Sequence, residues 1–515
     1  MLETLSAGLA LIASWENALA LLCGMFGGVV IGALPGLTGA MAVTLALPFT
    51  FYIPPITSLM LLLGIYKGSM YGGSISAILI RTPGTAAAAC TVLDGYPLAE
   101  RGEAGRALNM ALYASCFADM VSNLALIFFT GAIADFALRF GPPEFFSLIC
   151  FSLTIVAGLA GDSLIKGLLS ACLGLLMATV GMDLVFGTGR FTFDNVNLMA
   201  GLSFIPLVIG LFAIPEILKA VAGGGGAASV RMAVGASRVT WAEFRRCFKS
   251  IMRGSLIGVV MGAIPGIGGA PAAYLSYSEA KRYSPRRENF GKGELEGVAA
   301  AESGNNGVCG ATLIPLLSLG VPGDIVTAVM LGAFMMHNIT PGPLLFQENL
   351  PLVYALYAGI LFSSFLLFVS GILCIRGVAS LTRVPKAVLF PCVLTICLFG
   401  AYAVNNSEFD LLVMACMGLV GYGMSLFRIA EAPFLVAFIL GPLFEDNLRR
   451  SLLLSHGDPA ILWSTPICWF FLLLTAVSLA VTLRKEIGKA RRAAERSPAS
   501  AEAAPGAAAS PEGEA

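Results

Sequence analysis

Hydrophobic segments separated by short polar or charged stretches extend along nearly the whole chain, from Ala18 to Leu483. Many of them reach or approach the ~20 residues that a helix needs to cross a membrane. Several are interrupted by glycine, proline or polar residues, which break a helix where no water can satisfy the freed backbone groups. The pattern therefore predicts an all-α polytopic membrane protein with roughly 10–12 transmembrane segments, some of them broken helices or re-entrant hairpins.

Two of the interruptions are near copies of each other. Gly32–Ala40 reads Gly-Ala-Leu-Pro-Gly-Leu-Thr-Gly-Ala, and Gly262–Ala270 reads Gly-Ala-Ile-Pro-Gly-Ile-Gly-Gly-Ala, 230 residues later. A second pair of breaks follows, at Pro83-Gly84 in the first half of the chain and at Pro322-Gly323 in the second. One helix break could arise by chance, but matching breaks in register indicate an internal repeat.

The distribution of Lys and Arg predicts how the two copies are oriented. Residues 1–16 contain no Lys or Arg, whereas the stretch before the second copy carries a basic excess that is typical of a cytoplasmic loop. The copies would then enter the membrane from opposite sides, as inverted-topology repeats do. We predict a periplasmic N-terminus, a cytoplasmic C-terminus, a first membrane repeat at 1–220, a basic cytoplasmic linker at 221–253, a second membrane repeat at 254–483 and a disordered cytoplasmic tail at 484–515.

Composition supports a membrane protein and excludes several classes of function. Of the 515 residues, 57% are hydrophobic and only 12% are charged, whereas a soluble domain carries about 25% charged residues. The 31 basic and 31 acidic side chains balance, which gives no case for nucleic-acid binding. The two histidines and the twelve cysteines, which form no CxxC pair, argue against a transition-metal site or a histidine-based catalytic triad. We expect neither an enzyme nor a cofactor.

Several spaced motifs carry a family resemblance. Gly32–Ala40, Leu79–Leu98 and Glu296–Gly323 together resemble the large membrane subunit of the tripartite tricarboxylate transporters, the TctA family. Gly258–Ala270 and His337–Pro343 fit the same pattern, and the similarity covers most of the chain. The resemblance implies a secondary active, cation-coupled uptake system in a bacterial inner membrane. It also implies a small membrane subunit and a periplasmic solute-binding protein that delivers a carboxylate.

Two positions depart from the pattern of that family. A neutral polar residue is more usual where this chain has Arg81, and a small polar residue is more usual where it has Asp324. Both positions adjoin the second pair of helix breaks. They therefore bear on which substrate the resemblance implies.

The helix breaks predict the location of the substrate site. In secondary transporters built from inverted repeats, the site lies near the membrane midplane between broken helices. The N-termini of half-helices carry partial positive charge and free N–H groups, which suit a carboxylate. The alternative is that these residues form only packing kinks with small-residue helix contacts. The substrate-binding residues predicted on this basis are Gly36, Thr38, Gly39, Thr82, Gly84, Gly266, Gly268, Gly269 and Gly323.

Arg81 is predicted to supply the counter-charge of the substrate. An arginine inside a membrane is costly unless it is paired, and its planar guanidinium matches a carboxylate in bidentate fashion. A structural ion pair with Asp324 and an interfacial position are the alternatives. Lys67, a lone lysine within a hydrophobic segment, would pair with a carboxylate or with a bound anion.

Side-chain oxygens near the breaks predict a cation site, because they are the hard ligands that Na⁺ prefers. The alternative is a polar cap at the membrane surface. Three further acids, Asp119, Asp162 and Asp183, are expected near the ends of spans and outside the site. The cation-binding residues predicted for the coupling ion, Na⁺ (or H⁺), are Ser69, Ser74, Glu302, Asn305, Asn306 and Asp324.

Together these features predict a carboxylate:cation symporter whose two repeats move against each other and give alternating access. We expect the broken hairpins to form an elevator-like transport domain, and the remaining spans to form a lipid-facing scaffold that supports a homodimer. A stand-alone carboxylate transporter is the alternative function. An integral membrane enzyme would need clustered catalytic His or Asp residues, and a channel would need a continuous polar pore. The sequence shows neither pattern.

Overall fold

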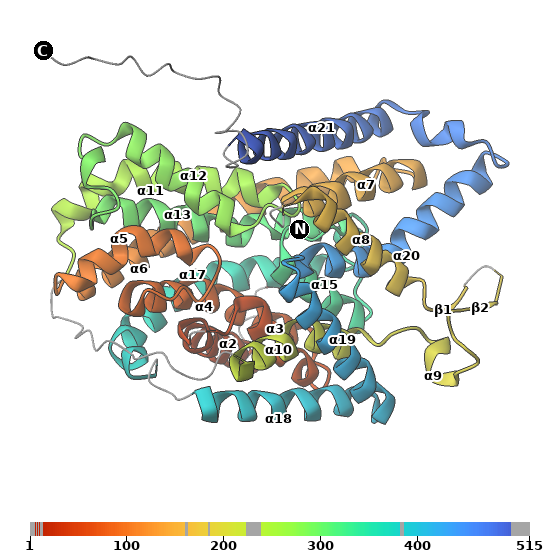
Figure 1. Cartoon of the computed structure of the whole chain (residues 1–515), viewed down its shortest axis with the longest axis horizontal. Helices are drawn as coiled ribbons and strands as arrows, with labels where there is room; N and C mark the ends of the chain where they lie inside the picture. The colour runs from red at the N-terminus through yellow and green to blue at the C-terminus, as the bar shows by residue number, and fades with distance from the viewer. Residues whose placement is uncertain are drawn as a thin grey trace, which may run out of the picture.

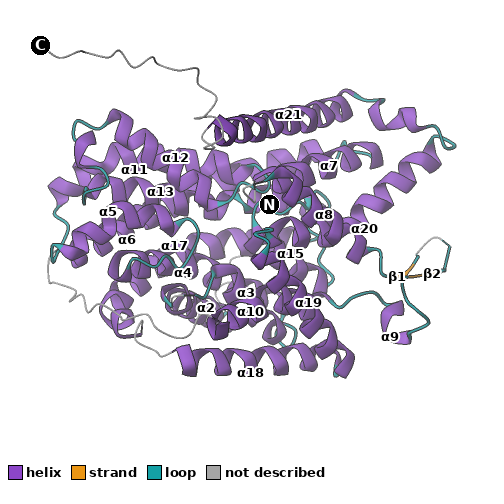
Figure 2. Ribbon diagram, in the orientation of Figure 1, coloured by secondary structure: helices purple, strands orange, loops and turns teal. Residues whose placement is uncertain are grey.

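The structure, a computed structural model, is almost entirely helical (Figure 1 and Figure 2). It describes residues 14–34, 36–159, 163–183, 186–222, 238–381 and 386–495, together with Ser6, Gly8 and Ala10. Pro35, Asp162, residues 223–237 of the predicted linker and the end of the predicted tail (496–515) lie outside the described residues. Strands are confined, within the described ranges, to the antiparallel pair β1 (Gly181–Met182) and β2 (Gly189–Arg190).

The first half of the chain forms the helices as far as α10. Their bounds are α2 (Trp15–Ala33), α3 (Gly39–Thr50), α4 (Pro55–Ile80), α5 (Ala88–Glu100), α6 (Ala104–Ala137), α7 (Pro142–Leu159), α8 (Leu164–Ala178), α9 (Val196–Met199) and α10 (Phe204–Ala222).

The second half forms the remaining helices and two short 3₁₀ turns. Their bounds are α11 (Trp241–Ala263), α12 (Gly269–Tyr283), η1 (Arg287–Asn289), α13 (Leu295–Ala311), α14 (Leu313–Leu319), α15 (Ile325–Met336), α16 (Leu345–Glu348), α17 (Leu350–Leu381), α18 (Lys386–Asn405), α19 (Glu408–Leu426), α20 (Glu431–Leu454), η2 (Pro459–Trp463) and α21 (Pro466–Glu495).

The two copies of the repeated motif break their helices in the same way. After α2 the chain turns extended at Leu34, and after α11 it turns extended at Ile264. Gly36 and Gly266 then take φ angles of +93° and +82°, which L side chains rarely adopt and glycine adopts readily. A new helix starts three residues beyond each glycine, α3 in the first half and α12 in the second.

The second pair of breaks is also matched between the halves, at a separation of 239 residues. The residues that follow α4 and α14 as C-caps, Arg81 and Gly320, are both in the left-handed conformation, with φ of 57° and 71°. The next glycines pack against the same surroundings. A Cβ on Gly84 would lie 2.9 Å from the Cα of Gly73, and one on Gly323 would lie 2.7 Å from the Cα of Thr312.

Close helix packing also repeats in the two halves. Helix α2 lies against α4, and a Cβ on Gly24, Gly28 or Gly32 would come within 2.4 Å of an α4 carbonyl oxygen. Helix α11 lies against α13, where Gly254, Gly258 and Gly262 make the corresponding approaches. Small residues allow backbones to pack this closely inside a membrane, where dispersion and hydrogen bonding drive helix association.

The two halves interleave rather than stand apart. The long helix α6 of the first half packs on α11 and α13, and the long helix α17 of the second half packs on α2 and α4. Outside this bundle, α8 packs on α20, α7 on α20 and α21, and α10 on α18 and α19. Each broken hairpin is therefore held by helices from both halves.

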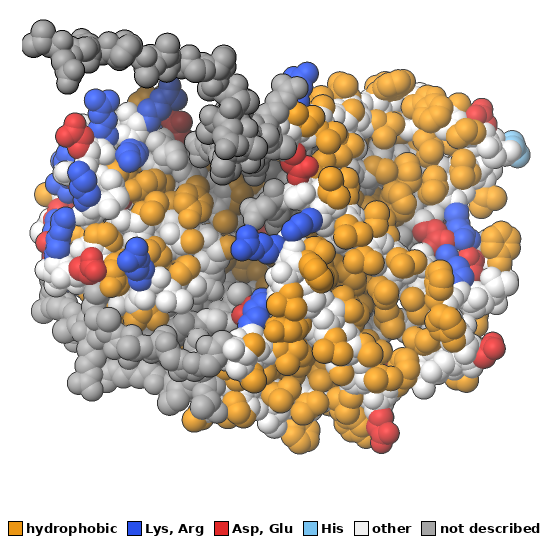
Figure 3. All heavy atoms as spheres, viewed as in Figure 1, with side chains coloured by type: hydrophobic (Ala, Val, Ile, Leu, Met, Phe, Trp, Pro, Cys, Tyr) orange, Lys and Arg blue, Asp and Glu red, His pale blue; other side chains and the backbone are white. Residues whose placement is uncertain are grey.

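The fold suits a multi-pass membrane protein. Among the described residues, seven helices are long and apolar enough to cross a membrane: α2, α6, α10, α18, α19 and parts of α17 and α21. Four shorter apolar helices, α3, α7, α8 and α15, accompany them. Figure 3 shows hydrophobic side chains over much of the visible surface, with several Lys and Arg side chains at the end where α11 and α12 lie. The prediction of an all-α polytopic membrane protein is confirmed, while the orientation of the two halves stays a prediction.

Two neighbouring glycines of α2 test the close packing. A Cβ on Gly28 would lie 2.4 Å from the carbonyl oxygen of Ile65, whereas a Cβ on Gly27 has nothing within 4 Å. Gly28→Ala is therefore expected to lower the free energy of unfolding by about 1–3 kcal/mol. Gly27→Ala, the matched control, is expected to leave it unchanged. Thermal unfolding in detergent measures both variants, and equal midpoints would contradict the close approach of α2 to α4.

Candidate functional site

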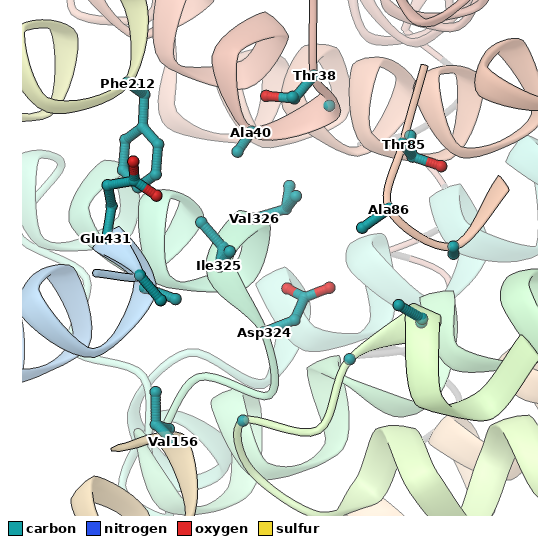
Figure 4. Close-up of a pocket in the computed structure, with 18 of the residues that line it drawn as sticks. Thr38, Ala40, Thr85, Ala86, Val156, Phe212, Asp324, Ile325, Val326 and Glu431 are labelled. Carbon is teal, nitrogen blue, oxygen red and sulfur yellow. The ribbon is translucent and has the colours of Figure 1, made fainter. Parts of the chain in front are cut away.

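A cavity of about 560 Å³ lies where the helix breaks meet. Residues at or just before the starts of α3, α5, α12, α15 and α20 line it, so that the N-termini of these helices border one space (Figure 4). Helix N-termini carry partial positive charge and unsatisfied N–H groups. The arrangement therefore favours an anion in the cavity.

The first half of the chain contributes two of these N-termini and the second half three, and four of the five form repeat-related pairs. The first half provides Thr38, whose Oγ1 accepts from the Met41 N–H at 3.2 Å, and Thr85, whose Oγ1 accepts from the Ala88 N–H at 3.2 Å. The corresponding positions in the second half are Gly268, which has no capping side chain, and Asp324. The two halves thus place equivalent helix N-termini at the cavity, but the side chains at these positions differ.

Asp324 is the acid at the centre of the cavity (Figure 4). Its Oδ1 accepts from the backbone N–H and the hydroxyl of Thr327, at 2.7 Å and 2.8 Å, which caps α15. Its Oδ2 accepts from the Tyr66 hydroxyl at 2.8 Å, and Tyr66 also lies 3.1 Å from the Thr312 hydroxyl. The carboxylate is held in one orientation by helices from both halves of the chain.

The electrostatics of the lining come from backbone and acids. Asp324, Glu216 and Glu431 line the cavity, and the described lining contains no Lys or Arg. Glu216 accepts from Lys219, its neighbour on α10, at 2.7 Å. An anion would therefore be bound by helix N-termini while it faces the carboxylate of Asp324, and a cation between them would relieve the repulsion.

Glu302 lies deeper in the protein, on α13, and is fully buried. Its Oε1 accepts from Ser74 at 2.6 Å and from Thr91, and its Oε2 accepts from Ser115 at 3.1 Å and from Asn306 at 3.3 Å. The carboxyl group is therefore surrounded by donors from α4, α5, α6 and its own helix. The ion pairs of the described residues include none to Glu302, which makes it a candidate for a proton or a bound cation.

Asn305, one position before Asn306, differs from its neighbour because neither polar atom of its side chain has a hydrogen-bond partner. Its side chain is fully buried. A Cβ built on Gly269 would lie 2.9 Å from the Asn305 Oδ1, 3.1 Å from Met70 and 3.3 Å from Ala87. Because Gly269, Met70 and Ala87 all line the cavity, Asn305 lies directly behind this part of its wall.

Lys67 is paired with an acid that sequence analysis had discounted. Its Nζ lies 3.0 Å from the Asp119 Oδ1 and 2.9 Å from the Asn123 Oδ1. Asp119 lies within α6 and is 1% exposed, so its expected position near the end of a span was wrong. Its partners on α4 and α17 are far away in sequence, and no local pattern marked them. Asp183, by contrast, follows β1, beyond the end of α8.

The structure brings together many of the residues that the sequence predicted for the site. Thr38, Gly39, Gly266, Gly268, Gly269 and Asp324 line the cavity. A second group lies buried behind the wall: Ser69, Ser74, Glu302, Asn305 and Asn306. Gly84 and Gly323 are buried at tight backbone contacts, with a Cβ on Gly84 only 1.9 Å from the Gly32 carbonyl oxygen.

Three further predicted residues neither line the cavity nor are buried near it. Gly36, Arg81 and Thr82 are exposed, and the Arg81 guanidinium lies 5.6 Å from the centre of the Tyr96 ring. The described ion pairs include none between Arg81 and Asp324. Thr85, Glu216 and Glu431 line the cavity although the sequence motifs did not predict them as site residues. The 239-residue separation that relates Pro83-Gly84 to Pro322-Gly323 also relates Thr85 to Asp324, and it could have identified Thr85.

Among the described residues, no group of three or more His, Cys, Asp or Glu side chains is arranged to hold a metal ion. The oxygen atoms around the cavity and around Glu302 are instead of the kind that binds hard monovalent cations. The arrangement therefore has the chemistry for an organic anion and an alkali cation or proton.

Known proteins that are similar to this chain include a transporter family and two bacterial relatives. The family model described as the tripartite tricarboxylate transporter TctA family matches residues 18–436. A protein of Agrobacterium vitis, described as an uncharacterized 52.8 kDa protein in the TAR-I ttuC' 3' region, is 35% identical over 496 residues, which cover 95% of this chain and 98% of the relative. A second A. vitis protein, from the TAR-II ttuC' 3' region, is 34% identical over 234 residues, or 45% of this chain and 97% of the relative. No solved structure matches.

Proposed function

Because the chain belongs to the tripartite tricarboxylate transporter TctA family, we propose that it is the large membrane subunit of a cation-coupled secondary transporter for carboxylates. Membership of this family makes it a membrane component of a transport system. The proposal adds that the system takes up di- or tricarboxylates across a bacterial inner membrane. A periplasmic solute-binding protein would deliver the substrate, and a small membrane subunit would complete the complex.

The single observation that carries the proposal is the cavity at the helix breaks. Several helix N-termini line it together with Asp324, and its lining contains no basic side chain among the described residues. Two like charges about 4 Å apart repel by about 4 kcal/mol at an effective dielectric constant of ~20. A carboxylate beside Asp324 therefore requires a cation, either Na⁺ or H⁺, to enter with it. The charges of the cavity thus support the proposal of cation coupling.

The repeated hairpins are consistent with a transport domain that moves relative to the outer helices. Breaks in α2–α3, α4–α5, α11–α12 and α13–α15 surround the cavity, and secondary transporters expose such a site alternately to the two sides of the membrane. We propose that these hairpins move as an elevator-like unit against α7, α8, α10 and α18–α21. The outer helices would then form the scaffold, the lipid contact and the interface of a homodimer.

Uptake into proteoliposomes tests the proposal. With the small subunit and the binding protein present, an inward Na⁺ or H⁺ gradient is expected to raise accumulation of radiolabelled citrate or succinate about tenfold above a gradient-free control, the ratio that 1.4 kcal/mol of driving force gives. Choline replaces Na⁺ in the control, and pH is equalised across the membrane.

Each component is then removed in turn. Uptake that is unchanged without the binding protein would favour a stand-alone carboxylate transporter. Uptake that does not respond to either gradient would reject cation coupling. Absence of carboxylate uptake under every condition would reject the substrate class.

A further inference from the structure

The repeat relates two pairs of polar residues in and behind the wall of the cavity. At the 239-residue separation that relates Gly84 to Gly323, Tyr66 corresponds to Asn305 and Thr85 corresponds to Asp324. The helix packing supports this register, because Gly28 approaches Ile65 as Gly258 approaches Gly304. The cavity therefore has one side with Tyr66 and Asp324, and an equivalent side with Asn305 and Thr85.

On the first of these sides the hydrogen bonds are complete. Tyr66 donates to the carboxylate of Asp324 at 2.8 Å, and that carboxylate also accepts from the first turn of α15. A carboxylate at a helix N-terminus with a hydroxyl donor is thus part of the protein itself. The Asp324 carboxylate therefore shows how a helix N-terminus and a hydroxyl donor in this repeat can bind a carboxylate.

On the equivalent side the carboxylate is missing. Asn305 replaces the much longer Tyr66, and Thr85 replaces Asp324. The Asn305 side chain is fully buried and both its polar atoms lack a partner. Burying an amide without partners is unfavourable, because no hydrogen bond offsets the loss of its contacts with water. A protein that keeps such an amide beside a cavity gains from it when a ligand supplies the missing partner.

The surroundings of Asn305 define which ligand group fits. Gly269, at the start of α12, leaves the Asn305 amide close to the cavity because a Cβ there would lie 2.9 Å from Oδ1. The start of α5 adjoins the same wall through Ala87, and Thr85 lines the cavity. A half-turn of the amide presents its NH₂ group in place of the oxygen. Two helix N-termini, a hydroxyl and an amide NH₂ are donors, which suit an anion.

We propose that Asn305 and Thr85, with the N-termini of α5 and α12, form the subsite for one carboxylate group of the substrate. The substrate carboxylate occupies the place that the Asp324 carboxylate takes in the other half. In this subsite the Asn305 amide donates a hydrogen bond to the substrate carboxylate, whereas the sequence predicts Asn305 as a ligand of the cation. The cation remains with Asp324. This inference rests on the proposed function and identifies which side of the cavity binds the substrate.

The variant Asn305→Asp separates the two roles of Asn305. An aspartate keeps the shape, repels a carboxylate and is a stronger ligand for a cation than an amide. The full chain in nanodiscs is titrated with citrate, succinate and acetate, which carry three, two and one carboxylates, at saturating and at limiting Na⁺ and at two pH values. The matched control is Asn109→Asp, at the start of α6, where the amide donates to the Gly105 carbonyl oxygen.

The expected result is a Kd for citrate about tenfold or more higher in Asn305→Asp, with the half-saturating cation concentration unchanged and Asn109→Asp like wild type. A citrate Kd within about twofold of wild type, or a cation affinity that rises, would overturn the carboxylate subsite and return Asn305 to the cation. Should Asn305→Asp fail to run as a single species in size-exclusion chromatography, Thr85→Val gives the decision: several-fold weaker citrate binding supports the subsite, and unchanged binding rejects it. If wild type itself binds none of the three probes under any cation condition, the proposed function fails, and the inference fails with it.

Discussion

Replacing Asp324 with asparagine is expected to remove the cation dependence of carboxylate binding while the fold stays intact. Asparagine is as good a helix N-cap as aspartate, so the cap of α15 made through Thr327 persists. The amide NH₂ group takes the place of Oδ2 and donates to the Tyr66 hydroxyl, which can then donate to the Thr312 hydroxyl 3.1 Å away. Only the negative charge is lost, and with it the repulsion that a cation relieves.

Binding of citrate measured with and without saturating Na⁺, and at two pH values, checks this expectation. Wild type should bind about tenfold or more tightly with the coupling cation, and Asp324→Asn should show a ratio near one. Gradient-driven accumulation in proteoliposomes should be lost as well, because substrate no longer carries a cation with it. This loss is expected to exceed that of any other single substitution proposed for the cavity.

The control is Glu408→Gln, which removes an exposed acid from the first turn of another helix, α19. It should behave as wild type in both assays. Retention of full cation stimulation by Asp324→Asn would place the coupling site elsewhere. Glu302, the fully buried carboxyl group on α13, would then be the next residue to substitute.

Removal of the Asp119 carboxylate is expected to produce the largest loss of stability. Lys67 and Asp119 are each 1% exposed and lie 3.0 Å apart, within a network that also includes Asn123 and Ser364. Asp119→Ala would leave the ammonium of Lys67 buried with only neutral oxygens around it. Breaking a buried pair from one side costs about 3–5 kcal/mol, because the remaining charge is uncompensated.

The double variant Lys67→Met/Asp119→Leu separates the charge from the packing. Replacing both partners by apolar residues of similar size is often neutral, so the double variant should be more stable than Asp119→Ala alone. Asp446→Ala serves as the control, because it breaks an exposed ion pair with Arg450, worth about 0–1 kcal/mol. Unfolding by a denaturing detergent, followed by fluorescence, measures all three. A double variant that is less stable than the single one would show that the pair is needed for more than charge balance.

Much of the fold could be predicted because the determining features are local. A Pro-Gly pair cannot continue a helix, and Gly36 and Gly266 take positive φ angles that favour glycine. Matching these breaks along the chain indicated a repeat, and glycines upstream of the breaks, such as Gly28 and Gly258, pack equivalently in the two halves. Long hydrophobic segments likewise predict spanning helices, because their own length and hydrophobicity suffice to stabilise them in the membrane.

The candidate site could be predicted only in part. The motif residues Gly39, Gly268 and Gly269 do line the cavity, since the ends of broken helices are natural sites for ligands. Thr85 was missed although the register of the repeat pointed to it. Arg81 is as close to a break in sequence as Thr85, yet it stacks on Tyr96 outside the lining. Adjacent residues at a break point in different directions, and composition does not specify which one faces the cavity.

The sequence by itself determined that this is an all-α membrane protein with two sets of matched helix breaks and the motifs of a transporter family. Backbone preference and hydrophobicity act residue by residue, so the sequence shows them directly. Only the tertiary structure decided that the breaks from both halves open onto one cavity, that Lys67 pairs with Asp119, and that Asn305 is buried with an unpaired amide. Charges and polar groups in a membrane find partners across long sequence separations, because desolvation makes an unpaired one costly wherever it lies.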